Sequence, residues 1–100
     1  MKYYSVISVT PTNEDWIPAY LEVVVGLVAK QGGQFLARTP NHEQLEGEKQ
    51  DAALRIIIEW PSRQAALDFS NDADYQPHLE ARLAGSVSQH FLIEGKDQLA

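Results

Sequence analysis

The stretch RIIIEWPS, residues 55–62, decides the fold because it is the clearest strand in the chain and it ends at a defined corner. Three consecutive isoleucines are typical of a buried strand, and Pro61 interrupts the pattern. Side chains alternate across a strand, which gives this one two different faces. One face is wholly apolar and consists of Leu54, Ile56, Ile58 and Trp60, while the other is mixed and consists of Arg55, Ile57 and Glu59. We expect the apolar face to pack on helices and the mixed face to point away from them.

Further strands and helices alternate along the rest of the chain. Stretches rich in β-branched and aromatic residues predict strands over residues 3–10, 34–39, 53–60 and 86–95. Helical length or spacing predicts helices within residues 20–33, 63–71 and 72–85. The polar residues 41–52 carry no strong pattern beyond QLEG (44–47), which would fit a short edge hairpin.

The helix boundaries carry their own signals. Asn13 or Asp15 is placed to cap the first helix, and Ser62 is placed to cap the second. The run Lys-Gln-Gly-Gly at residues 30–33 combines a cation in the last turn with glycine, which predicts the end of the first helix.

The order of elements is β-α-β-β-α-β, which predicts an α+β, ferredoxin-like fold with a four-stranded, mostly antiparallel sheet and helices on one face. Several strands are nevertheless apolar on both faces, whereas a strand with one wet face should alternate. Two helical layers on one side leave the other side bare, and monomers rarely expose so large an apolar surface. We therefore expect a homodimer in which the sheets of two copies pack together.

Composition bounds the possible partners and compartments. The chain has 100 residues, no cysteine, and 8 Lys and Arg against 14 Asp and Glu, a net charge of −6. This length predicts a single domain over residues 1–95 with a C-terminal tail at 96–100. The negative charge argues against nucleic acid, and no apolar run is long enough to span a membrane. Together with the lack of a signal sequence, these features predict a soluble cytoplasmic protein.

The first candidate site residues lie on the two strands that flank residues 40–53. If that connection is symmetric, Arg38 lies opposite Arg55 and Gln34 lies opposite Glu59 on the mixed face. Two opposed arginines are unfavourable unless an anion lies between them. That anion is Glu59, a carboxylate of the partner subunit, or a bound ligand. The first two give an ion-pair network that fixes the dimer, and the third gives a pocket for a small organic acid or an enolisable carbonyl compound.

Three more residues complete the candidate ligand-binding set. His90 opens the stretch HFLIEG and is able to point into a cavity beside the sheet. Tyr75 and Arg82 are seven residues apart, which places them on one helix face if the helix is continuous. The three histidines have no metal-ligand spacing, and the chain has no dinucleotide fingerprint, phosphate loop or catalytic elbow. We expect no metal and no cofactor.

Several stretches resemble the bacterial family called domain of unknown function 1330, in the dimeric α/β-barrel superfamily. They are KQGGQFLART (30–39), LEGEK (45–49), the run 54–85 and the closing FLIEG (91–95). The most specific parts are Gly32 and Gly33 with Leu36 and Arg38, the tripeptide 45–47, the corner 59–62, and Tyr75 with Arg82. The resemblance implies a ferredoxin-like subunit and a dimer through the sheets. It implies no reaction, because the activity of the family is not established.

Two functions from different classes fit these residues. In one, the dimer binds a small organic acid or carbonyl compound, in a cavity between sheet and helices or at the dimer interface. In the other, it is a cofactor-independent enzyme of the oxygenase or isomerase type. Arg38 or Arg55 would then stabilise developing negative charge, and Glu59 or His90 would move a proton.

Overall fold

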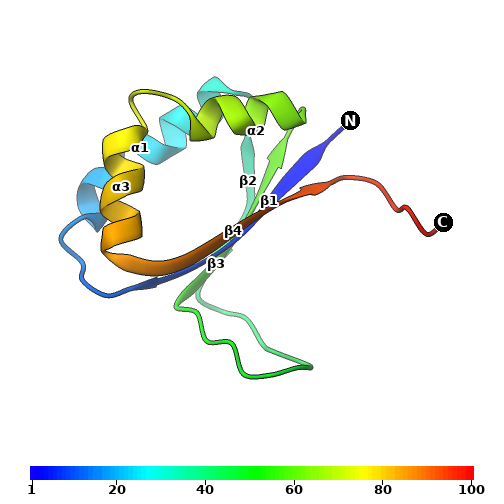
Figure 1. The fold of residues 1–100 in the computed structure, drawn as a ribbon, viewed down its shortest axis with the longest axis horizontal. Coiled ribbons are helices and arrows are strands. Elements are labelled where there is room, and N and C mark those ends of the chain that lie inside the picture. Colours follow the sequence, from blue (N-terminus) through cyan, green and yellow to red (C-terminus); the bar gives the residue numbers. More distant parts are fainter.

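The secondary structure follows the predicted order. A computed structural model describes residues 1–100 and contains four strands and three helices (Figure 1). The strands are β1 (Tyr3–Pro11), β2 (Gln34–Thr39), β3 (Leu54–Trp60) and β4 (Ser86–Glu94). The helices are α1 (Ile17–Lys30), α2 (Arg63–Ser70) and α3 (Gln76–Ala84). The predicted second helical layer thus consists of two consecutive short helices.

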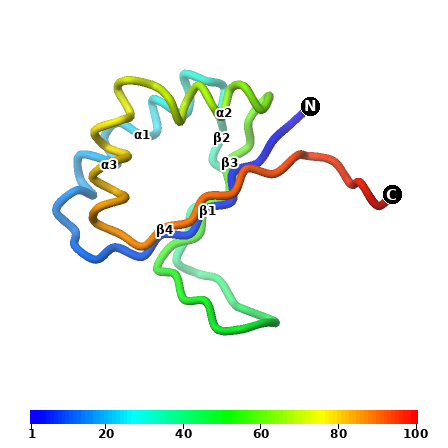
Figure 2. The backbone as a smooth tube through the Cα atoms, in the orientation of Figure 1, coloured from blue at the N-terminus to red at the C-terminus, as the bar shows by residue number.

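The four strands form one sheet in the order β2-β3-β1-β4, and all three neighbouring pairs are antiparallel. The helices follow one another along a single side of this curved sheet, as the backbone trace shows (Figure 2). This arrangement confirms the ferredoxin-like α+β fold that the sequence predicts. No helix combines the length and the apolar character that crossing a membrane requires.

The helix boundaries agree in part with the sequence signals. The Ser62 side chain accepts a hydrogen bond from the Ala65 amide (3.1 Å), so the predicted cap of α2 is confirmed. The predicted cap of α1 is wrong, because that helix begins after Trp16 and has no side-chain cap. Asn13 instead accepts a hydrogen bond from the Asp15 amide and shapes the turn before the helix.

A β-bulge in β2 corrects the predicted register. Gln34 lies opposite Glu59, as expected, but the pairing skips one residue between Phe35 and Ala37. Arg38 therefore lies opposite Ile56 rather than Arg55, whose partner is Thr39. An extra residue in one strand reverses the face of every side chain that follows it. The prediction that Arg38 and Arg55 share a face is wrong, because Arg38 points to the helix side.

The core lies between the helices and the apolar face of the sheet. Trp60 at the end of β3 is completely buried and packs on Phe69 of α2, with the ring centroids 5.3 Å apart. Its indole nitrogen donates a hydrogen bond to Ser5 Oγ (2.8 Å), which is also completely buried. The remaining core residues are Ile7, Val9, Val24, Val28, Ile58, Ala66 and Tyr75. The apolar face of β3 thus packs on the helices, as predicted.

The opposite side of the sheet, called the outer face below, carries rows of cross-strand partners. The central row is apolar and consists of Ala37, Ile57, Val6 and Phe91. A polar row on one side consists of Thr39, Arg55, Ser8 and Gln89. The row on the other side consists of Gln34, Glu59, Tyr4 and Ile93. Val6, Ile57 and Phe91 are exposed in the single chain, so no helix or loop covers the apolar row.

Residues 40–53, called the arm below, contain no strand, so the edge hairpin considered for them is wrong. The arm projects from the end of the sheet away from the helices (Figure 1). Its own polar groups shape it, because the Gln44 side chain donates to the carbonyls of Glu46 and Glu48 and accepts from the Gln50 amide.

We predict opposite effects for two glycine-to-alanine substitutions. A Cβ at Gly33 would lie 2.6 Å from the Trp60 ring and 2.7 Å from Val28, whereas a Cβ at Gly26, within α1, meets nothing within 4 Å. Gly33→Ala should lower the free energy of unfolding by about 1–3 kcal/mol through overpacking. Gly26→Ala should raise it by about 0.5–1 kcal/mol, since alanine is the better helix former. Urea denaturation measures both, and equal effects would contradict the packing described here.

Candidate functional site

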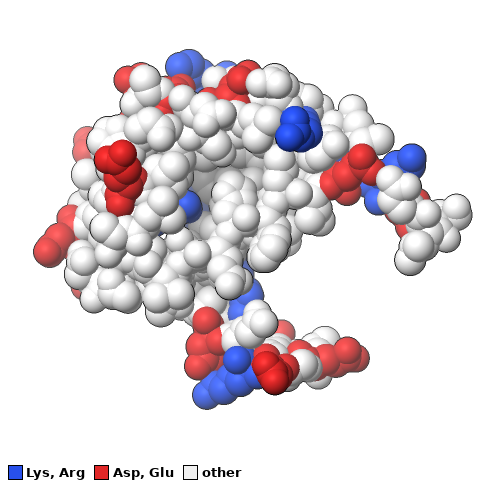
Figure 3. All heavy atoms as spheres, viewed as in Figure 1, with Lys and Arg blue, Asp and Glu red and all other residues white.

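A cavity of about 200 Å³ lies between the sheet and the helices. Fourteen of its eighteen lining side chains are hydrophobic, so its wall is mainly apolar. Figure 3 shows the hollow, whose visible walls are almost free of charge, with most charged side chains on the rim, the arm and the end of the chain. The basic side chains in the lining are those of Arg38, Arg82 and His90, and Tyr20 and Tyr75 add hydroxyl groups. No aspartate or glutamate lines the cavity.

Arg82 on α3 is buried in the wall of this cavity, with only 5 % of its surface exposed. One guanidinium nitrogen donates to the Tyr20 hydroxyl at a long 3.4 Å, and the guanidinium carbon lies 5.8 Å from the centre of the Tyr20 ring. Its Nε atom is buried without any hydrogen-bond partner. No ion pair in the structure includes Arg82. The chain therefore buries a permanent cation without an anion, which is costly unless a ligand supplies one.

Tyr20 and Tyr75 join α1 to the segment before α3 at the same end of the cavity. Their hydroxyl oxygens are 2.7 Å apart and share a hydrogen bond. Burial, and secondarily the neighbouring Tyr20, raises the pKa of the Tyr75 hydroxyl far above its ordinary value. Tyr75 is therefore a neutral hydroxyl at all physiological pH values, and it cannot supply the missing negative charge.

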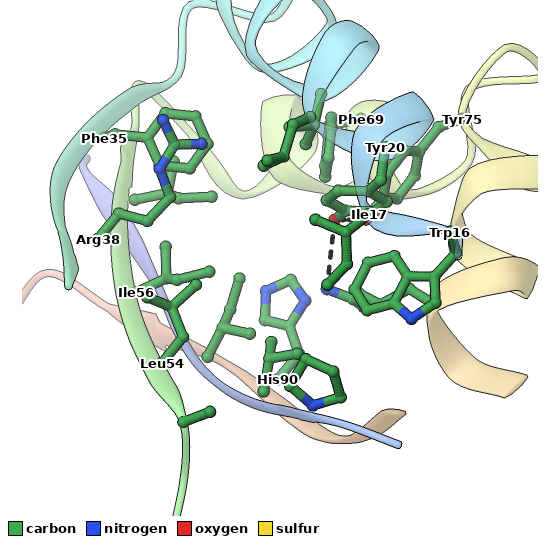
Figure 4. A pocket seen from close by; sticks show the side chains of 18 residues that line it. Trp16, Ile17, Tyr20, Phe35, Arg38, Leu54, Ile56, Phe69, Tyr75 and His90 are labelled. Carbon is green, nitrogen blue, oxygen red and sulfur yellow. Dashed lines mark hydrogen bonds between the residues drawn. The ribbon is translucent and has the colours of Figure 1, made fainter. Parts of the chain in front are cut away.

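Arg38 reaches the cavity from β2 because of the bulge. Its guanidinium carbon lies 4.2 Å from the centre of the Phe35 ring, a cation–π contact. Figure 4 shows Arg38 and Phe35 on the β2 side of the cavity, Trp16, Ile17 and Tyr20 on the α1 side, and open space between them. Arg38 is exposed and has no ion-pair partner. The cavity thus carries two arginines in a chain whose net charge is −6.

His90 extends from β4 into the open space of the cavity (Figure 4). Its Nε2 atom lies 2.7 Å from Ser5 Oγ on the neighbouring strand β1, and Ser5 Oγ also accepts from Trp60 Nε1. The cavity walls desolvate the imidazole and the nearby Arg82 repels its proton, so the pKa of His90 is lowered from the ordinary 6.5. The imidazole is therefore mainly neutral at pH 7.

The candidate residues divide between the two faces of the sheet. Arg38, Tyr75, Arg82 and His90 line the one cavity. Arg55 and Glu59 lie on the outer face, so they do not meet the other four. Arg55 donates to His42 Nδ1 and to the Gln50 carbonyl, which ties it to the arm. Glu59 pairs with Lys2 (3.1 Å) and accepts from the Tyr4 hydroxyl (3.3 Å).

Sequence reasoning missed two residues of the site, Tyr20 and Ser5. Ser5 had a readable signal, because it shares the strand parity of Ile7 and Val9 and is thus a polar residue on a buried face. Tyr20 had none, since the spacing of α1 identifies it only as a residue of an apolar helix face. No group of histidine and carboxylate side chains is arranged to hold a metal ion.

We predict that the lowered pKa of His90 is visible in solution. NMR titration of the imidazole protons should give His90 a midpoint below 6.5, because burial and Arg82 both disfavour the cation. The unfolded chain binds this proton first as pH falls below 6.5, so the His90 contribution to stability is complete above pH 6.5 and is lost below it. A midpoint at or above 6.5 would contradict the desolvated cavity.

Comparisons with solved structures find proteins with the same ferredoxin-like fold. A protein of unknown function from Rhodopseudomonas palustris, RPA0582, matches with a TM-score of 0.79 and 16 % identity over 96 % of this chain and 83 % of its own. A dimeric ferredoxin-like protein of unknown function from Jannaschia sp. CCS1 matches with a TM-score of 0.74 and 15 % identity over 94 % and 99 % of the two chains. These identities show the fold alone.

Some structural neighbours are enzymes. SnoaB, a cofactor-independent oxygenase from Streptomyces nogalater, matches with a TM-score of 0.56 and 20 % identity over 98 % of this chain and 94 % of its own. No curated protein matches the chain. The family described as Domain of unknown function (DUF1330) matches residues 2–96. Since that match spans nearly the whole sequence, the chain belongs to the DUF1330 family.

Proposed function

We propose that this protein binds a small organic anion, such as a carboxylic acid or the anionic form of a carbonyl compound, in the cavity between sheet and helices. One observation carries the proposal: Arg82 is buried in the cavity wall with an unpartnered Nε and no carboxylate near it. A bound carboxylate would accept two hydrogen bonds from the planar guanidinium and remove the cost of burying its charge.

The rest of the cavity suits the body of such a ligand. Apolar side chains from α1, β1 and β3 form its wall, and a few polar groups converge on it, which is the usual composition of a small-molecule site. Arg38 stands at the exposed side, where a guanidinium attracts anions from solution. We place the site within one subunit rather than at a subunit interface, because all these side chains lie on the helix side of the sheet.

We further propose a cytoplasmic homodimer in which the outer faces of two sheets pack together. The apolar row of Ala37, Ile57, Val6 and Phe91 is flanked by polar rows, the pattern of an interface with an apolar centre and a polar rim. A structural neighbour is described as dimeric. A second copy of the same chain would cover the apolar row, as a two-fold interface requires.

A cofactor-independent enzyme of the oxygenase or isomerase type is the second candidate. It is favoured by the convergence of Arg38, Arg82 and His90 on one cavity, which would stabilise negative charge on a reacting carbonyl compound. Arg55 and Glu59 have no part in it, because they lie on the outer face. Binding is the better supported function, since no carboxylate lines the cavity and a hydrogen bond with Ser5 engages His90 Nε2.

Binding can be tested with benzoate and its uncharged analogue benzamide. We expect benzoate to raise the melting temperature and benzamide to leave it unchanged, because only the anion forms an ion pair with the Arg82 guanidinium. Arg82→Met should weaken benzoate binding by about 10-fold to 100-fold, the effect of a charged hydrogen bond. The same variant should fold as well as the native chain or better, since it removes an unpaired buried charge.

Arg63→Met is the matched control, because Arg63 is exposed on α2 and lies outside the cavity. It should bind benzoate like the native chain. If benzoate and benzamide behaved alike, or if Arg82→Met only lost stability and kept its affinity for benzoate, the proposed anion site would be wrong.

The dimer can be tested by introducing a glutamate on the outer face of the sheet in one variant and on the helix side in another. Phe91 on the outer face is 63 % exposed and Leu83 on α3 is 56 % exposed, so they are matched in accessibility. Phe91→Glu should convert the dimer to a monomer in sedimentation velocity, because it buries a carboxylate in the apolar row. Leu83→Glu should remain a dimer. A monomeric native chain, or a dimer that Phe91→Glu does not disturb, would overturn the interface.

A further inference from the structure

We propose that Ser5 and Trp60 hold His90 as a neutral imidazole that donates a hydrogen bond from Nδ1 into the cavity. The site would thereby select the oxyanion form of an apolar acid, phenol or enol. This inference rests on the proposed anion site and names the chemical form of the ligand that the site takes.

The first step concerns the hydroxyl hydrogen of Ser5. Ser5 is completely buried, so its hydroxyl group has no access to solvent. Its oxygen already accepts a hydrogen bond from Trp60 Nε1 (2.8 Å), which is only a donor. Its other hydrogen-bond partner is His90 Nε2 at 2.7 Å. Buried hydroxyl groups use their hydrogen, and Nε2 is the one acceptor in reach, so Ser5 donates to His90.

The second step fixes the tautomer of His90. A neutral imidazole carries one hydrogen, and a nitrogen that accepts a hydrogen bond cannot also carry it. With Nε2 accepting from Ser5, the hydrogen is on Nδ1. Nδ1 has no hydrogen-bond partner within the chain, and the ring projects into the open space of the cavity (Figure 4). Nδ1 is therefore a free donor available to a ligand.

The third step compares what the cavity offers to a ligand. The charged and titratable groups that line it with His90 are Tyr20 from α1, Arg38 from β2, Tyr75 before α3 and Arg82 from α3. The arginines are donors only, and the free nitrogen of His90 is a donor as well. No carboxylate contributes an acceptor. The hydroxyl groups of Tyr20 and Tyr75 are engaged with each other, and that of Tyr20 also accepts from Arg82. A ligand oxygen that carries a hydrogen would therefore meet no charged acceptor, whereas an oxyanion would accept from several donors at once.

The neutral state of His90 also favours the binding of an oxyanion through an uncharged N–H donor. A cationic imidazole would need to form beside the buried Arg82, and both burial and that charge lower the pKa of His90. The imidazole thus serves as an uncharged donor, comparable to a backbone amide in an oxyanion site. Its second nitrogen is engaged with Ser5, so His90 is no base towards the ligand, and the general-base role considered for it from the sequence is replaced by a donor role.

The tautomer can be measured directly in the native chain. We expect the side-chain ¹⁵N spectrum near pH 7.5 to show His90 with a protonated Nδ1 and an unprotonated Nε2. Ser5→Ala should relax this preference and give a mixture of the two tautomers. Ser8→Ala is the matched control, since Ser8 is on the same strand but on the outer face. A protonated Nε2 in the native chain would overturn the inference whatever the variants do.

Ligand selection can be followed with 4-nitrophenol, whose phenolate has its own absorption band and which titrates near neutral pH. The native chain should bind the phenolate, so that the bound chromophore ionises at a lower pH than the free one. His90→Phe should weaken phenolate binding by about tenfold or more, through loss of a hydrogen bond to a charged oxygen. Ser5→Ala should weaken phenolate binding severalfold, because only a fraction of the protein molecules then carries the hydrogen of His90 on Nδ1.

The outcomes separate the two proposals. If phenolate binds and depends on Arg82, but His90→Phe and Ser5→Ala bind it like the native chain, the role of His90 is overturned and the anion site stands. If neutral nitrophenol binds better than phenolate, the selection of oxyanions is overturned. If neither nitrophenolate nor benzoate binds the native chain, the anion site fails and this inference fails with it.

Discussion

The side chain of Trp60 is the point on which core and cavity both depend. It is completely buried, packs on Phe69 of α2, and lies so close to Gly33 that no side chain fits there. The same indole donates to Ser5, which holds His90 in the cavity. A core aromatic with a polar handle thus connects packing to the geometry of the site. The indole and Ser5 are both completely buried, so the core fixes the position of the hydroxyl group that His90 contacts.

The two faces of the sheet carry charge in opposite ways. On the outer face, Arg55 is bonded to the arm and Glu59 to Lys2 and Tyr4, so each charge has partners within its own chain. On the helix side, Arg82 is buried and has no anionic partner. Surface charges that have partners contribute little to stability. A buried charge without a partner is costly and marks a position where a bound ion or ligand would supply the partner. The sheet therefore separates charges that have partners within the chain from a buried charge that has none, for which we propose an anionic ligand.

The sequence predicts the fold well and the site only in part, for physical reasons. The alternation in RIIIEWPS and the cap at Ser62 are local patterns, and both are found as predicted. The resemblance to the DUF1330 family is confirmed over residues 2–96. The bulge at Leu36 is not marked in the sequence by a glycine or proline at that position, so it could not be predicted. This bulge alone moves Arg38 to the helix side of the sheet. Arg82 was a candidate from the sequence, but its lack of a partner depends on how three helices and four strands meet around the cavity.

The unpaired guanidinium of Arg82 has a consequence for the amount of this protein in a cell. An anion that binds only the folded chain adds stability that grows with its concentration, about 2.7 kcal/mol when its concentration is a hundred times its dissociation constant. Quality-control proteases remove chains from the unfolded fraction, so the steady-state amount of a marginally stable protein follows its stability. If the proposed anion site is filled in this way, the abundance of the chain would rise and fall with the concentration of that anion, even without any catalysis.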